Sequence, residues 1–280
     1  MNKQSGQRLG DILSYIFMAV CFVFFAGPLF WLLSMALRTR KEAFLGVARL
    51  IPQSPTLDNF ISVLTNASFL VYLWNGLVLS CISAAGVLIV SAPAAYAFSR
   101  FRLRGKPVWL LSILAFQMIS PLVIMVPLYR YMSWLGLTDT QFAVIMVYIA
   151  LGVPLGTWLL KGTMDAIPRA LDEAAMIDGS SPFAIFWRVI LPLSSPGLAS
   201  VFIISVIAGW SQFLVPFLLI STDKKMPIAV GVFNYQGSST DASTQLLAAA
   251  CLVSVVPAII AFLALQRFIL QALTAGAVKG

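Results

Sequence analysis

Two neighbouring acidic residues, Asp172 and Glu173, stand beside the small residues Ala174 and Ala175 in a chain that otherwise has few groups able to do chemistry. The chain has no histidine, which removes the commonest general base and the commonest metal ligand. Its three cysteines lie singly in apolar runs without metal-ligand spacing, so we expect buried free thiols. The sequence predicts no enzyme and no metal site. The acidic pair suits a solvated loop or a docking surface.

Neutral polar residues inside apolar stretches are the other candidates. These residues, with an aromatic neighbour, are Asn75, Gln117, Ser120, Trp210, Ser211 and Gln212. Their amides and hydroxyls can hydrogen-bond an uncharged polyol, because polar groups inside a membrane need partners. The alternative is that they tie helices together, and for each residue taken singly this alternative is favoured. No acidic or basic residue falls in the core of a long apolar stretch, which argues against an ion-coupled carrier.

The elements that carry these residues follow from composition. Hydrophobic residues make up 60% of the 280 residues and charged residues only 10%, where a soluble domain has about a quarter charged. A bilayer-crossing helix needs about 20 apolar residues, and six such stretches occur. We predict an all-α membrane protein whose spans lie near residues 12–37, 71–98, 108–129, 142–160, 198–221 and 246–268. Each span contains a proline, which predicts six kinked helices.

Basic residues set the expected orientation. The loop between the second and third spans holds Arg100, Arg102, Arg104 and Lys106, and short cytoplasmic loops carry such an excess. Six spans then place both termini in the cytoplasm, with residues 1–11 and 273–280 outside the membrane domain of residues 12–272. The same bias accounts for the net charge of +8, so we expect membrane lipid and no nucleic acid as a partner.

A cytoplasmic loop of residues 161–197 separates the fourth and fifth spans. A first short helix is predicted over Arg169–Asp178, because Pro168 suits its first turn and Gly179 can end it. A second is predicted to begin at Ser181 as N-cap and to end at Pro192. One apolar face of this second helix, which is expected to lie against the bilayer or the helix bundle, comprises Phe183, Phe186, Trp187 and Ile190.

These residues resemble a known family. Glu173-Ala174-Ala175, Asp178-Gly179 and Ile190-Leu191-Pro192 match the EAA loop of ABC importer permeases. Residues 94–102 (AAYAFSRFR) and 121–129 (PLVIMVPLY) resemble the second and third spans of sugar permeases, and residues 273–280 resemble the tail of the maltose-type permease. The sequence departs from the family at Gln212, where an acidic residue is common. Any role that depends on a charge there is not carried over.

The resemblance implies a type I ABC importer permease bundle in the bacterial cytoplasmic membrane, transporting a sugar or related polyol. It implies a second homologous permease, two ATPase subunits that use ATP and Mg²⁺, and an extracytoplasmic substrate-binding protein. In that family the EAA loop is the coupling helix, so the ATPase contact is expected at Glu173, Ala174, Ala175, Asp178 and Gly179. A permease for another solute and an ion-coupled carrier are the alternatives.

Two further segments are expected to meet partners. Residues 222–245 face outside, where a contact with the binding protein is expected at Asn234, Tyr235, Gln236 and Gly237, a plain polar connector being the alternative. The resemblance places the C-terminal tail between the ATPase subunits, through Leu273, Thr274, Ala275, Gly276, Lys279 and Gly280. The alternative for the tail is the disorder usual at chain ends.

Overall fold

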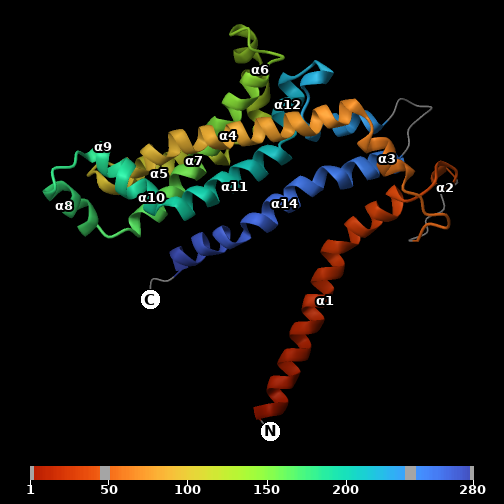
Figure 1. The fold of residues 1–280 in the computed structure, drawn as a ribbon, viewed down its shortest axis with the longest axis horizontal. Helices are drawn as coiled ribbons and strands as arrows, with labels where there is room; N and C mark the ends of the chain where they lie inside the picture. The colour runs from red at the N-terminus through yellow and green to blue at the C-terminus, as the bar shows by residue number, and fades with distance from the viewer. Residues whose placement is uncertain (1–2, 45–50, 237–243, 278–280) are drawn as a thin grey trace. The chain divides into compact units, whose positions relative to one another are not determined.

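The structure is a computed structural model. It describes the backbone of residues 3–44, 51–236 and 244–277, and the side chains of residues 11–42, 51–235 and 244–263. The described residues form helices and irregular connections, with no strand among them, which confirms the all-α prediction (Figure 1). The chain divides into two compact units, one made of residues 1–69 and 232–256 and the other of residues 70–231 and 257–280.

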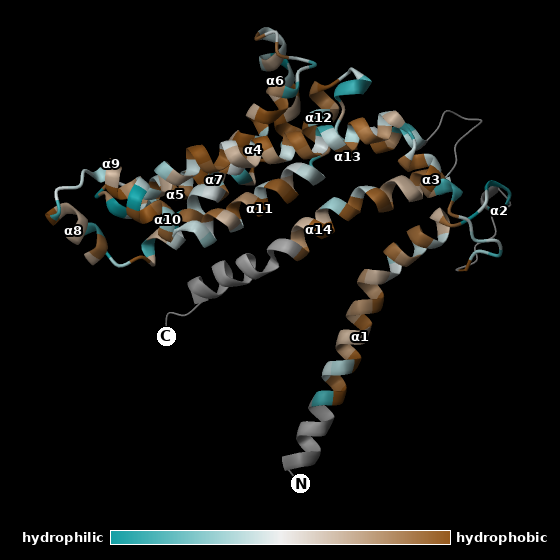
Figure 2. Ribbon diagram, in the orientation of Figure 1, coloured by the Kyte–Doolittle hydropathy of each residue, from teal (hydrophilic) through white to brown (hydrophobic). Residues whose placement is uncertain are grey.

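Four continuous helices are long and apolar enough to cross a membrane, and Figure 2 shows hydrophobic residues along each of them. They are α1 (Lys3–Ala36), α4 (Ala67–Arg100), α7 (Gln141–Asp165) and α14 (Thr244–Ala277). Each contains a predicted proline within one unbroken helix, namely Pro28, Pro93, Pro154 and Pro257. Two bent pairs of helices pass the same test, so the described residues contain up to six spans when each pair counts as one, and the second pair, residues 182–211, begins inside the predicted loop.

The predicted third span, residues 108–129, is a sharp bend instead of a kinked helix. It consists of α5 (Lys106–Ala115), the 3₁₀ turn η1 (Phe116–Met118) and α6 (Pro121–Trp134), with an angle of 91° between the two halves. Ser120 has an extended backbone, as residues before a proline do, and Pro121 supplies no N–H to continue the helix. The polar Ser120 therefore marks the bend.

The fifth predicted span, residues 198–221, is also divided. Helix α11 (Ser195–Ser211) ends where Gln212 becomes extended, and α12 (Leu214–Leu219) follows. A helical segment precedes α11 and consists of α9 (Pro182–Ile185), the π-helical turn η2 (Phe186–Ile190) and α10 (Leu191–Leu193). The angle between this segment and α11 is 74°. The second loop helix ends at Leu193, one residue after Pro192, where the sequence predicted its end.

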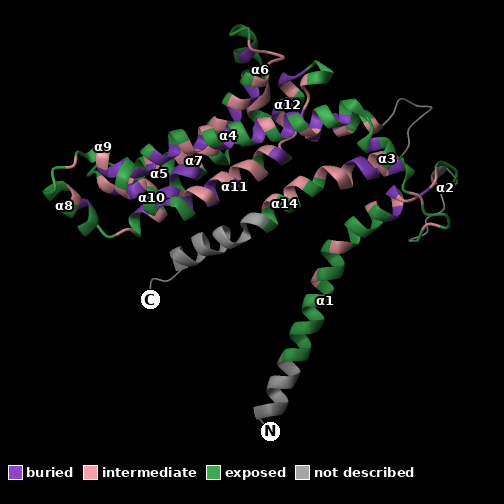
Figure 3. Cartoon of the chain, viewed as in Figure 1, coloured by how far each residue is buried: buried purple, intermediate pink, exposed green. Residues whose placement is uncertain are grey.

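The larger unit is a bundle in which α7 packs against α11, α5 and α12 (Figure 1). One hydrophobic cluster joins α4, α7, α9, η2 and α11 and includes Val87, Tyr96, Leu160, Met164, Ile185 and Ile190. A second cluster joins α4, α6, α7 and α12 and includes Leu79, Val144, Tyr148, Val215 and Leu219. Figure 3 shows buried residues along α4, α7 and α11, which makes this bundle the frame for any site.

The smaller unit contains α1, α2 (Arg40–Phe44), α3 (Asp58–Leu64) and the 3₁₀ turn η4 (Val232–Gln236). The amide of the buried Asn59 donates to the carbonyls of Ala36 and Arg38, at 2.8 Å each, and so ties α3 to the end of α1. The apolar side chains of α1 are mostly exposed (Figure 3). The cysteines are free as expected, but Cys81 is exposed and Cys21 and Cys251 are only half-buried.

Candidate functional site

The acidic pair found in the sequence lies on α8 (Ala170–Ile177), a short helix at one end of the larger unit (Figure 1). Its acidic residues fall in the first turn, where the helix dipole favours them. At the other end, Gly179 has a φ of +81°. The N–H of Ser180 donates to the carbonyl of Ala175 and that of Gly179 donates to Met176, the pair of bonds that closes a Schellman motif. The predicted end of this helix is therefore confirmed.

The outward surface of α8 combines one charge with small and apolar side chains. Glu173 and Ala174 are exposed, as are Asp178 and Gly179. Ile177, with an exposed fraction of 87%, is the most exposed of three large apolar residues, the others being Leu171 and Met176. Such a surface costs free energy in water and is typical of a contact with another molecule. Four of the five residues predicted for docking therefore lie together on an open surface.

Ala175, the fifth, lies differently. It is half-buried and packs against the hydrophobic cluster of α4, α7 and α11. Asp172 lies three residues earlier on the same inward side and is buried. Adjacent acidic residues thus have opposite surroundings, which the sequence alone did not indicate.

Asp172 is held by the last residue of α4. Its Oδ2 lies 2.7 Å from Nε of Arg100, and both side chains are almost wholly buried, with exposed fractions of 8% and 9%. The same guanidinium donates to the carbonyl of Ile167, at 3.1 Å, and to Oγ of Ser99, at 3.3 Å. One arginine therefore contacts both the first loop helix and the segment that leads into it.

The second loop helix is fixed to the same end of α4. Oγ of Ser181 accepts from the N–H of Ala184, which confirms the predicted N-cap. The Tyr96 hydroxyl of α4 donates to the carbonyl of Pro182 at 3.1 Å. The expected apolar face is split, since Phe186 and Ile190 are buried in the bundle whereas Phe183 and Trp187 are exposed.

Two of the predicted membrane-embedded polar residues meet at a pocket of about 180 Å³ between α4, η1, α7 and α11. Gln117 and Gln212 line it together with Ser83, Tyr148 and Ser205. Oγ of Ser83 is buried and makes no hydrogen bond within the described residues. The Tyr148 hydroxyl donates to the carbonyl of Gln212 at 3.3 Å, and the Gln117 amide donates to Leu151 at 3.2 Å. The pocket thus offers neutral donors and acceptors, and its lining residues include no acidic or basic side chain.

The other predicted pathway residues lie elsewhere. Asn75 donates from its amide to the carbonyls of Lys224 and Met226, at 2.9 and 3.0 Å, and so holds the segment after α12 to α4. Ser211 donates back to carbonyls of its own helix, Trp210 is buried, and Ser120 stands at the bend. Asn75 therefore ties two segments together, which is the alternative that the sequence left open, whereas Ser211 bonds carbonyls of its own helix.

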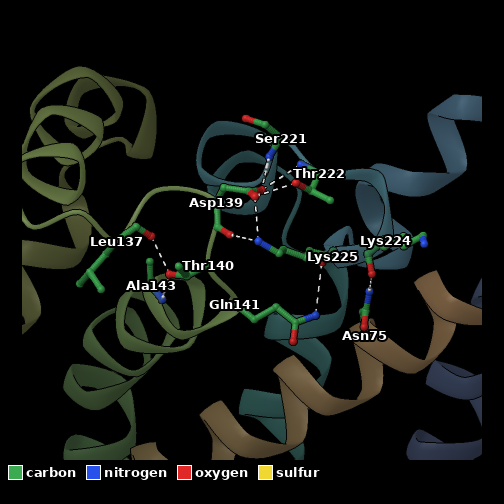
Figure 4. A network of polar contacts seen from close by, with 10 residues as sticks. All are labelled: Asn75, Leu137, Asp139, Thr140, Gln141, Ala143, Ser221, Thr222, Lys224 and Lys225. Carbon is green, nitrogen blue, oxygen red and sulfur yellow. Dashed lines mark hydrogen bonds and ion pairs between the residues drawn. The ribbon is translucent and has the colours of Figure 1, made fainter.

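Opposite the loop helices, a polar clasp joins the start of α7 to the segment after α12 (Figure 4). The clasp comprises Asp139, Ser221, Thr222 and Lys225. The carboxylate of Asp139 accepts from both backbone amides, from the Thr222 hydroxyl and from the Lys225 ammonium, at 2.7–2.9 Å. Asp139 has a φ of +57°, a backbone region in which Asp is tolerated better than most residues. The clasp orients the 3₁₀ turn η3 (Asp223–Lys225) and α13 (Ile228–Gly231) that follow.

The ammonium of Lys225, and then the hydroxyl and backbone N–H of Thr222, hold the pKa of the Asp139 carboxyl far below its ordinary value. A lowered pKa in the folded protein means that the stabilisation is complete above the ordinary pKa, about 3.9, and is lost only as the pH falls below that value.

We therefore expect the protection of the Ser221 and Thr222 amides from hydrogen exchange to be the same at pH 7 and pH 5. Asp139→Ala should abolish that protection, whereas Asp58→Ala, at an exposed carboxylate, should not. If the two amides were protected equally in Asp139→Ala and in the wild type, the Asp139 carboxylate would not be what holds this segment.

The segments predicted to meet the binding protein and the ATPase pair are described only in part. Asn234 is exposed in η4, and Tyr235 packs edge-to-face on Phe69 with ring centres 5.8 Å apart. The side chain of Gln236 and all of Gly237 lie outside the described residues. For the tail, Leu273, Thr274, Ala275 and Gly276 continue the backbone of α14, but their side chains are not described, and Lys279 and Gly280 lie outside the described residues.

The family model for the "binding-protein-dependent transport system inner membrane component" matches residues 86–274. The inner membrane ABC transporter permease protein YcjP of Escherichia coli is 31% identical, over 100% of this chain and 99% of that protein. The maltose/maltodextrin transport system permease protein MalG of Yersinia pestis is 34% identical, over 100% and 97%. The galactooligosaccharides transport system permease protein GanQ of Bacillus subtilis is 33% identical, over 96% and 95%.

The chain therefore belongs to the family of binding-protein-dependent transport system inner membrane components. A crystal structure of a bacterial ABC transporter involved in the import of the acidic polysaccharide alginate contains a chain with the same fold, at a TM-score of 0.81 and 22% identity over 95% of this chain and 98% of that one. The protein is accordingly the multi-pass permease subunit of an ABC importer in the bacterial cytoplasmic membrane. Separate subunits of such importers hydrolyse the ATP.

Proposed function

We propose that this permease imports a sugar or a related polyol. The observation that carries the proposal is the full-length similarity to permeases whose names specify maltose, trehalose, maltodextrin and galacto-oligosaccharides. The pocket of the larger unit supports it, because its polar lining is made of hydroxyls and amides without an ionisable acid or base. A charged solute requires an opposite charge to offset its desolvation inside the membrane, whereas a sugar needs only hydrogen-bond partners.

We further propose that the chain works beside a second, homologous permease, with two ATPase subunits that bind the nucleotide and Mg²⁺, and with an extracytoplasmic binding protein. The open surface of α8 is the proposed contact with an ATPase subunit. This assignment places both termini in the cytoplasm and the polar clasp on the outer side. The short loop rich in arginine after α4, on the same end as α8, supports that orientation.

Reconstituted transport tests the proposal. The complex, purified with its own partner subunits and placed in lipid vesicles with its binding protein, should take up at least one member of a panel containing maltose, trehalose, maltodextrins and galacto-oligosaccharides. Uptake should require ATP inside the vesicles and should persist when proton and sodium gradients are collapsed. ATP-driven uptake of an amino acid, with no sugar transported, would establish the first alternative. Uptake that follows an ion gradient without ATP would establish an ion-coupled carrier.

A further inference from the structure

The C-terminal end of α4 contacts the loop before, within and after α8. Tyr96 bonds the carbonyl of Pro182 after α8, and Arg100 contacts Ile167 before it and Asp172 within it. The hydroxyl of Ser99 adds a bond to Asp165 at the end of α7, at 2.7 Å. The end of one helix thus determines where α8 lies relative to the bundle.

The contact between Arg100 and Asp172 is unusual because both charges are buried. Removing two charges from water costs several kcal/mol per ion, and an apolar pair of similar size often folds at least as well. A buried ion pair therefore adds little to stability, but it does specify one arrangement among several. The guanidinium adds to that specification, since its Nε lies 2.7 Å from the carboxylate while a terminal nitrogen donates to the Ile167 carbonyl.

Helix α4 also lines the pocket, through Ser83, Ala84 and Val87. Val87 and Arg100 belong to the same unbroken helix, and at 1.5 Å per residue they are about 20 Å apart along its axis. A displacement of α8 that is passed to Arg100 therefore reaches the pocket through one continuous helix.

We propose that the ion pair between Arg100 and Asp172 locks α8 to α4, so that a movement imposed on α8 also moves the helix that lines the pocket. This inference rests on the proposed contact between α8 and an ATPase subunit. Asp172 faces the bundle, away from the open surface that carries Glu173, so it is a positioning residue and does not itself touch the ATPase. Its removal is expected to separate ATP hydrolysis from transport without preventing assembly.

The test compares Asp172→Asn, the charge-exchanged pair Arg100→Asp with Asp172→Arg, and the control Asp11→Asn, which makes the same chemical change at an exposed carboxylate. Each variant is purified as the whole complex in lipid nanodiscs, and hydrogen exchange is followed over the amides of α8. In Asp172→Asn this exchange should be at least about tenfold faster than in the wild type, because loss of one charge from a buried ion pair is strongly destabilising and a destabilised element opens more often. The exchanged pair should recover most of the protection, and the control should match the wild type.

Vesicles loaded with ATP and supplied with the binding protein and a mixture of maltose, trehalose, maltodextrins and galacto-oligosaccharides give the second measurement. Sugar taken up per ATP hydrolysed should fall about tenfold or more in Asp172→Asn and should return in the exchanged pair. If the ion pair served only stability, its loss would lower the yield of the complex but leave the ratio of sugar taken up to ATP hydrolysed unchanged. If Asp172→Asn does not accumulate, Asp172→Glu, which keeps the charge but lengthens the side chain, is measured in its place with the same expected direction.

Unchanged exchange in α8 together with an unchanged uptake ratio would overturn the lock. Failure of the exchanged pair to recover either quantity, in a complex that assembles, would also overturn it. If the wild type takes up none of the sugars, the proposed solute class fails, while hydrogen exchange still decides whether the lock exists. If Glu173 proves dispensable for assembly and hydrogen exchange in α8 is still faster in Asp172→Asn, the proposed contact with the ATPase is wrong. The proposal that the ion pair holds α8 to α4 is then retained.

Discussion

A complex that carries Glu173→Lys should lose at least about tenfold in association between the permease and its ATPase subunits, and coupled uptake should fall with it. Glu173 is the only acidic side chain among the exposed residues of α8 itself, and the exposed apolar side chains around it will exclude water once a partner docks. Breaking one partner of a desolvated charge pair costs about 2–5 kcal/mol, which corresponds to tenfold or more in affinity. Co-purification of the ATPase subunits and their dissociation constant measure the effect.

Two comparisons make this prediction specific to the α8 surface. Asp11→Lys reverses an exposed carboxylate on α1 and should leave the association unchanged. Ala174→Trp, on the open surface, should block docking while the isolated permease keeps its melting temperature. Ala175→Trp should lower that melting temperature instead, because Ala175 packs against the hydrophobic core. Normal association in both Glu173→Lys and Ala174→Trp would remove α8 from the interface.

A large loss of stability is expected from Gly152→Leu in α7. A Cβ at Gly152 would lie 2.6 Å from Cγ2 of Val87, and the contact is reciprocal, because a Cβ at Gly86 of α4 would overlap Ile149. The two helices thus approach through small residues, as helices in membranes commonly do. Forcing a larger side chain into such a contact costs about 1–3 kcal/mol, so the melting temperature of the purified permease should fall by several degrees.

Gly162→Leu is the matched control for this substitution. Gly162 lies in the same helix, is exposed, and has no neighbouring atom within 4 Å of the position that a Cβ would occupy. Leucine is a better helix former than glycine by up to about 1 kcal/mol, so this variant should melt at the wild-type temperature or above it. Equal melting temperatures for the two variants would show that α4 and α7 do not pack through Gly152.

Features that depend on neighbours along the chain could be predicted from the sequence. Apolar length predicted the six spans, and local capping predicted the Ser181 N-cap and the end of α8 at Gly179. Two predicted spans are divided, and each division has a local cause. Pro121 makes the preceding residue extended, so a bend replaces the expected kink, and the fifth span is interrupted where the backbone of Gln212 becomes extended.

Composition, span number and the motif around Glu173 thus determined the family of this protein and the position of its loop helices. The tertiary structure alone decided that Asp172 turns inward to Arg100 while Glu173 turns outward, and that Gln117 and Gln212 share a pocket while Asn75 holds a neighbouring segment. The physical reason is that hydropathy and capping are set by residues a few positions apart, within one turn of helix. Which face of a helix is buried, and which polar groups meet, is set by contacts between residues some 70 positions apart, as Arg100 and Asp172 are, and no local pattern encodes them.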